Sequence, residues 1–140
     1  MLPADIHPCL QGIVPATIVT CSLDGVPNTT YISQVYFVDE THVALSFQFF
    51  NKTIRNVREN PHVVALVTDP MAYRQWHLNL RYDHSETEGD LYDQMEMQLM
   101  AVASLHGLED LMDLKAADVY EVLSVRELDV HESDPTAVAG

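Results

Sequence analysis

The sequence predicts a mainly β protein, a small six-stranded antiparallel barrel with inserted helices. Short segments rich in β-branched residues follow one another with turn signals between them. The two segments with helical periodicity interrupt this series instead of alternating with every strand, which disfavours a parallel βαβ sheet. At 140 residues and 47% hydrophobic composition, the chain suffices for one domain. We expect that domain over residues 1–131, and a flexible tail over residues 132–140.

The first half of the chain contains three expected strands. Residues 16–22 are rich in β-branched side chains, and Asp24-Gly25 provides the turn of a hairpin. The second strand is expected at residues 28–38 and the third at residues 42–49, where apolar residues alternate towards the end. Because the three strands are consecutive, they predict a meander.

A short helix is expected after the third strand, at residues 53–59, because the period of the pattern changes at Asn51. Ile54 and Val57 are three positions apart, as on one face of a helix, and Pro61 ends the run two residues after Glu59. Either Asn51 or Thr53 could cap the start of this helix. The change of period therefore places a strand end and a helix start side by side.

The second half of the chain completes the expected series with three strands and one helix. The strands are expected at residues 62–68, 73–83 and 118–125, and the helix at residues 90–106, with Gly107 as its C-cap. The helix is indicated by the apolar spacing of Leu91, Met95, Leu99 and Val102. Trp76 is expected to pack inside the barrel, with contact to a ligand as the alternative.

The composition excludes several classes of function. The 21 acidic residues outnumber the 7 basic ones, giving a formal net charge of -14, which disfavours nucleic acids and anionic membranes as partners. We find no apolar run long enough to span a membrane and no basic signal-like N-terminus, so we expect a cytoplasmic protein. The glycine positions rule out both G-x-G-x-x-G and a Walker loop. The scattered histidines predict no metal site.

Three of the seven basic residues, Lys52, Arg55 and Arg58, lie within one seven-residue window. Lys52 lies where the expected strand ends and the helix begins, next to Asn51 and Thr53. Free backbone N–H groups, a hydroxyl, an amide and an ammonium can converge there, which suits a phosphate group. The alternative is that these cations only neutralise nearby carboxylates on the protein surface.

Residues 15–70 resemble the pyridoxamine 5'-phosphate oxidase-like group of FMN-binding split-barrel proteins. The resemblance is carried by GVPN at 25–28, SQVYFVD at 33–39, LSFQFFNKT at 45–53 and NVRENP at 56–61. It implies a six-stranded antiparallel split barrel that forms a homodimer, with FMN bound at the subunit interface.

The resemblance also implies which residues bind the cofactor. Tyr31, Ile32, Ser33 and Gln34 would lie along the flavin and its ribityl chain, and Ser46, Phe47 and Gln48 would line the same groove from the next strand. Asn51, Lys52 and Thr53 would hold the phosphate, where the residues alone also indicate an anion.

Three departures separate this chain from the oxidases proper. Thr30 stands where those enzymes usually have an arginine, Lys52 is followed by Thr53 where they commonly have a second cation, and the final residues 136–140 lack an aromatic or basic side chain. We therefore do not expect pyridoxamine phosphate oxidation.

Two classes of function remain. The first is an FMN-dependent oxidoreductase that acts on an unknown small-molecule substrate with an unknown electron donor. Because the flavin supplies the redox chemistry, no catalytic side chain is identified. The second is a non-catalytic module for flavin binding, sensing or dimerisation. Since haem-degrading relatives exist, a histidine serving as an axial haem ligand is a further alternative.

Overall fold

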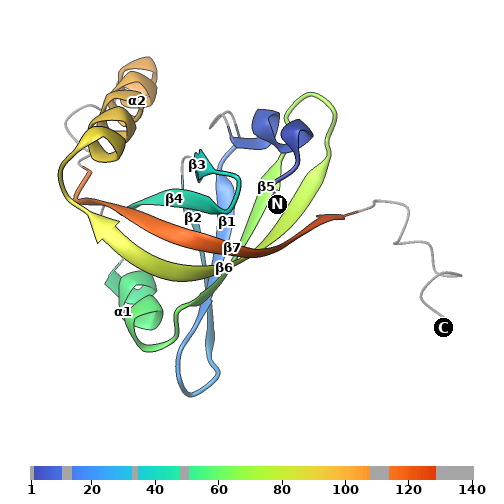
Figure 1. Cartoon of the computed structure of the whole chain (residues 1–140), viewed down its shortest axis with the longest axis vertical. Coiled ribbons are helices and arrows are strands. Elements are labelled where there is room, and N and C mark those ends of the chain that lie inside the picture. Colours follow the sequence, from blue (N-terminus) through green and yellow to red (C-terminus); the bar gives the residue numbers. More distant parts are fainter. Residues whose placement is uncertain (1, 11–13, 33–34, 48–50, 108–113, 129–140) are drawn as a thin grey trace, which may run out of the picture.

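The computed structural model describes residues 2–10, 14–32, 35–47, 51–107 and 114–128 (Figure 1). These residues form, in chain order, η1 (Ala4–Leu10), β1 (Ala16–Cys21), β2 (Pro27–Ile32), β3 (Val35–Asp39), β4 (His42–Phe47), α1 (Asn51–Glu59), β5 (His62–Thr68), β6 (Gln75–Glu86), α2 (Asp90–His106) and β7 (Ala116–Leu128). The predicted tail and its boundary at residue 131 lie outside the described residues.

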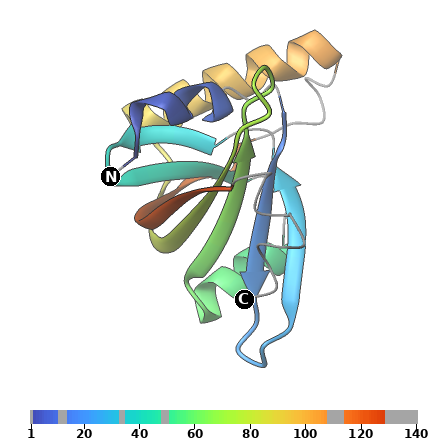
Figure 2. The ribbon, with the colours of Figure 1, turned by 90° about the vertical axis from the view of Figure 1, so that its right-hand side faces the viewer.

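The strands form one antiparallel sheet in the order β2-β1-β5-β6-β7-β4-β3. In a flat sheet the edge strands β2 and β3 would lie roughly 29 Å apart, at about 4.8 Å per step. The chain joins Ile32 of β2 to Val35 of β3 through three residue steps, which span at most about 11 Å. The sheet must therefore curl until its two edges approach each other, and Figure 2 shows this curl.

The structure corrects the number of strands. The segment predicted as one strand at residues 28–38 forms two strands, β2 and β3, so the described residues contain seven strands instead of six. β2 pairs with β1 in the hairpin whose turn contains Gly25 at φ 83°, while β3 pairs with β4. The predicted meander is thus divided between the two edges of the sheet, because each half of the segment has a different partner.

The bounds of two strands, β6 and β7, differ most from the prediction. The fifth predicted strand begins at Gln75 instead of residue 73, because Tyr73 has a left-handed backbone at φ 57° within the turn after Asp69. The last strand, β7, extends beyond the predicted range of 118–125 in both directions, because β6 pairs with it from Gln75 to Glu86. Long-range pairing therefore sets the length of β7.

Both predicted helices are confirmed. α1 covers residues 51–59, so it begins two residues before the predicted run, and Thr53 lies inside the helix and is not its cap. α2 ends at the predicted C-cap, Gly107, whose φ of 67° is the left-handed conformation that favours glycine. α1 packs against β1 and β2, whereas α2 packs against β7 (Figure 1). No helix in the described ranges is both long and apolar enough to cross a membrane.

The main core fills the inside of the curled sheet. Side chains alternate between buried and more exposed along β1 and β5, as expected for strands with one face on the core. The core includes Trp76, so the predicted packing of this residue is confirmed. A second cluster forms beneath α2, where Met95 and Leu99 contact Tyr36 and Val119. Val57 of α1 belongs to the main core, so this core also holds α1 against the sheet.

Candidate functional site

Three of the residues predicted to bind the cofactor line one small cavity. Ile32 at the end of β2, Ser46 near the end of β4 and Thr53 in the first turn of α1 all contribute to it. Its volume is about 20 Å³, and Asp118 and Tyr120 of β7 also line it. The fold therefore brings together side chains that are far apart in the sequence.

Hydrogen bonds hold α1 in place beside this cavity. The Asn28 Nδ2 of β2 donates to the Thr53 hydroxyl at 3.2 Å, and the Asn56 Nδ2 donates to the Thr20 hydroxyl of β1 at 3.1 Å. Thr20, Thr53 and Asn56 are buried, so the loss of either bond would leave a buried polar group unsatisfied. The β1–β2 hairpin thus fixes the orientation of the helix whose N-terminus faces the end of β4.

A larger pocket of about 270 Å³ adjoins the small cavity and shares Ile54 and Asp118 with it. We call it the Asp118 pocket. It lies between one face of α1 and the paired ends of β6 and β7, and it is lined by Ile54, Val57, Arg58, Tyr82, Ser85, Thr87, Lys115, Ala116 and Asp118. The two cavities together form a site that is apolar along its sides and polar at selected points.

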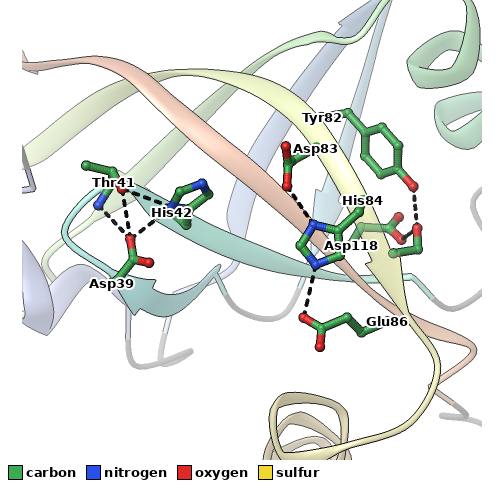
Figure 3. Close-up of polar contacts among 9 residues, drawn as sticks. Asp39, Thr41, His42, Tyr82, Asp83, His84, Glu86 and Asp118 are labelled. Carbon is green, nitrogen blue, oxygen red and sulfur yellow. Dashed lines mark hydrogen bonds and ion pairs between the residues drawn. The ribbon is translucent and has the colours of Figure 1, made fainter.

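Asp118 is the most unusual group in this site, because its side chain is only 4% exposed. The Ser85 hydroxyl donates to Asp118 Oδ1 at 2.6 Å, and the Tyr82 hydroxyl lies 2.5 Å from Ser85 Oγ (Figure 3). Burial raises the pKa of the Asp118 carboxyl, and this effect is opposed by the hydrogen bond from Ser85 and the charge of Arg58. The group therefore retains a proton to a higher pH than an ordinary aspartate.

The structure does not bring all the predicted residues together. Tyr31 is 65% exposed and does not line either cavity, because adjacent residues of a strand point to opposite faces and Ile32 takes the inner face. Ser33, Gln34 and Gln48 lie outside the described residues. The backbones of Phe47, Asn51 and Lys52 are described, at the end of β4 and the start of α1, but their side chains are not.

Sequence reasoning missed the acidic part of the site. It treated Asp118 only as the first residue of a strand, whereas the residue lies inside β7 among the buried positions 116–120. The available signal was a single carboxylate within an otherwise apolar stretch, since such a group needs a specific partner when buried. The partner, Ser85, is 33 residues away and only the pairing of β6 with β7 reveals it.

The residues present suit the parts of a flavin nucleotide in chemical character. Hydroxyl groups and the backbone N–H groups of the first turn of α1 favour a phosphate. Apolar side chains such as Ile54 favour a flat ring. In the described part of the chain, no three His, Cys, Asp or Glu side chains gather in a way that could hold a metal ion.

Comparison with known proteins identifies the family. Residues 2–124 match the family model described as pyridoxamine 5'-phosphate oxidase. The chain belongs to this family. No curated protein matches at a significant level. The resemblance noted over residues 15–70 is therefore confirmed, and it extends over most of the chain.

Solved structures of other proteins share this fold. An FMN-binding protein from Syntrophomonas wolfei subsp. wolfei aligns with a TM-score of 0.75 at 16% identity, covering 90% of this chain and 86% of that one. An F420 reductase aligns at 0.62 with 14% identity, covering 89% and 98%. HutZ, the heme storage protein from Vibrio cholerae, aligns at 0.58 with 16% identity, covering 89% and 93%. These structures confirm the predicted antiparallel split barrel for this member of the oxidase family.

Proposed function

We propose that this protein binds FMN where β4 meets α1, and that it is an FMN-dependent oxidoreductase acting on a small molecule. The observation that carries the proposal is the convergence of Ile32, Ser46 and Thr53 on one cavity, since they come from three separate elements. The family and the S. wolfei FMN-binding protein of the same fold support the choice of cofactor.

Each part of the site has a role in this proposal. Thr53 and the first-turn N–H groups of α1 bind the phosphate, with Lys52 adding a charge-assisted hydrogen bond worth about 1.5–3 kcal/mol. Ser46 and Ile32 contact the ribityl chain and the ring, and Ser33, Gln34, Phe47, Gln48 and Asn51 complete the groove as the family resemblance implies. When bound, FMN supplies the hydride or electron transfer, while the protein orients the ring and excludes water.

The proposal includes a homodimer. The cavity lined by Ile32, Ser46 and Thr53 has a volume of only about 20 Å³, far below the usual size of a ligand pocket, which starts near 300 Å³. A single chain therefore supplies only one side of an FMN site. A second copy of the chain would provide the other side and cover the flavin ring.

Titration of the purified chain with FMN tests this proposal. We expect quenching of flavin fluorescence that saturates at one FMN per chain, with the complex retained on ultrafiltration. Thr53→Val removes the hydroxyl but keeps the shape of the side chain. It should weaken FMN binding by about three- to tenfold, as expected for one lost hydrogen bond. Thr41→Val is the matched control, because Thr41 lies in the β3–β4 turn, where its hydroxyl bonds to Asp39. Absence of saturation, or equal weakening by the two variants, would contradict the proposal.

A further inference from the structure

The Asp118 pocket has a distribution of charge that the proposed FMN site does not explain. Its inner end holds the buried carboxyl of Asp118, while Arg58 and Lys115 line it as exposed residues. Two of the seven basic residues of a chain with a net charge of -14 thus border the same pocket. These two cations can attract an anionic group to the opening of the pocket.

The described part of the chain gives these two cations no ion pair, although the charge of Arg58 acts on the Asp118 carboxyl. Among the residues that the structure describes, no carboxylate lies within ion-pair distance of Arg58 or Lys115. By contrast, Arg74 contacts both Asp5 and Glu127. An anionic group on a ligand would therefore meet two unpaired cations at the outer end of the pocket.

The inner end requires the opposite kind of group. Ser85 occupies Asp118 Oδ1, and no other described side chain donates to this carboxyl, so Oδ2 remains for a ligand. Because Ser85 donates its proton to Asp118, the Tyr82 hydroxyl must donate to Ser85 Oγ, and this chain of bonds fixes the orientation of the carboxyl. A buried carboxylate that is held in this way accepts a hydrogen bond from an N–H group.

The size and the walls of the pocket limit the rest of the ligand. Ile54 and Val57 from α1 and Ala116 from β7 form apolar sides, and Tyr82 contributes an aromatic ring. The volume of about 270 Å³ is at the lower end for small-molecule sites. These features suit a single flat ring or a pair of fused rings.

We propose that the Asp118 pocket binds a small planar molecule that presents an N–H donor to Asp118 and a carboxylate or phosphate to Arg58 and Lys115. The pocket adjoins the cavity lined by Ile32, Ser46 and Thr53, so a molecule bound here would lie next to the proposed flavin site. It is therefore the compartment for the substrate of the proposed oxidoreductase. The binding itself does not require FMN.

Calorimetric titration with orotate and uracil tests this inference. Both are flat rings with N–H donors, but only orotate carries a carboxylate. We expect saturable binding of orotate that is at least about tenfold tighter than that of uracil. Arg58→Ala and Lys115→Ala should each reduce the preference for orotate over uracil, while Asp118→Leu should weaken the binding of both molecules. The conservative Asp118→Asn, which keeps an acceptor oxygen, should retain part of the binding and shows whether a loss in the leucine variant reflects misfolding.

Arg55→Ala is the matched control for charge, since Arg55 lies on the same helix but does not line the pocket. No saturable binding of orotate, no preference over uracil, or an equal loss in the Arg55 and Arg58 variants would overturn the inference. A repeat with saturating FMN should leave orotate binding intact, and competition between the two would show that the pocket belongs to the flavin site instead. If FMN does not bind at all, the titration of orotate without FMN still tests whether the Asp118 pocket binds a ligand.

Discussion

The two ends of the β6–β7 pair are built differently. At the closed end, where Trp76 is paired with Glu127, the Arg74 guanidinium binds both oxygens of Glu127 at 2.7 and 2.9 Å and Asp5 at 2.9 Å. The same guanidinium lies 5.2 Å from the centre of the Trp76 ring. At the open end, where Glu86 is paired with Ala117, a pocket lies against the strands. Asp118 is buried there, and no cation of the described ranges forms an ion pair with it.

The difference separates the structural part of the barrel from the part available for binding. At the closed end, Arg74 is paired with two carboxylates and lies over Trp76 at the edge of the core. At the open end, Asp118, Arg58 and Lys115 form no ion pair among the described residues, and a buried carboxyl costs stability unless a partner satisfies it. We therefore expect the closed end to contribute more to stability, and the open end to serve the proposed ligand binding.

The largest expected effect is a loss of stability at the closed end. Trp76→Ala removes a large side chain that is only 7% exposed, and it should lower the free energy of unfolding by about 3–5 kcal/mol. Ser85→Ala at the open end removes a single hydrogen bond to Asp118 and should cost about 1–2 kcal/mol. Urea unfolding followed by circular dichroism measures both. If Ser85→Ala proved as costly as Trp76→Ala, the proposed division between the two ends would be wrong.

A smaller effect distinguishes two histidines of β6. The hydrogen bond to Asp83 raises the pKa of His84 near the open end, whereas burial and then the charge of Arg126 lower the pKa of His77 nearer the closed end. In NMR titrations, His84 should therefore titrate above 6.5 and His77 below it. Figure 3 shows the His84 ring between Asp83 and Glu86.

The two shifts have opposite consequences for stability. The raised pKa of His84 favours the folded state below the unfolded pKa of about 6.5, and this contribution disappears as the pH rises through the folded value. The lowered pKa of His77 reduces stability as the pH falls below about 6.5. Because the His84 ring is half exposed, its contribution should stay below about 1 kcal/mol. Asp83→Asn should return the His84 titration towards 6.5, and an unchanged titration would contradict this explanation.

Local signals in the sequence were sufficient for much of the fold. Asp24-Gly25 predicted the first hairpin, and the apolar spacing of residues 53–59 and 90–106 predicted both helices, because turns and helices depend on neighbouring residues. The division of residues 28–38 into β2 and β3 could not be predicted in this way. It depends on which strands lie at the two edges of the sheet, and that is a property of long-range pairing.

The same distinction holds for the site. Ser46 and Thr53 were predicted from a family pattern that covers consecutive residues, and the structure places them in one cavity with Ile32. Asp118, Ser85 and Lys115 were not predicted, because their common pocket arises only when β6 and β7 pair beside α1. Tyr31 was predicted as a site residue without regard to the alternation of the strand, which turns its side chain away from the cavity.

The most direct test of the central claim is the affinity of wild-type and Lys52→Ala protein for FMN and for riboflavin, which lacks the phosphate. If the start of α1 binds the phosphate, Lys52→Ala should weaken the binding of FMN by about 10- to 100-fold and leave the affinity for riboflavin nearly unchanged. Arg55→Ala, with the same change in net charge, should alter neither affinity appreciably. Equal losses of affinity for FMN and for riboflavin in the Lys52 variant would contradict the claim that this junction of β4 and α1 holds the phosphate.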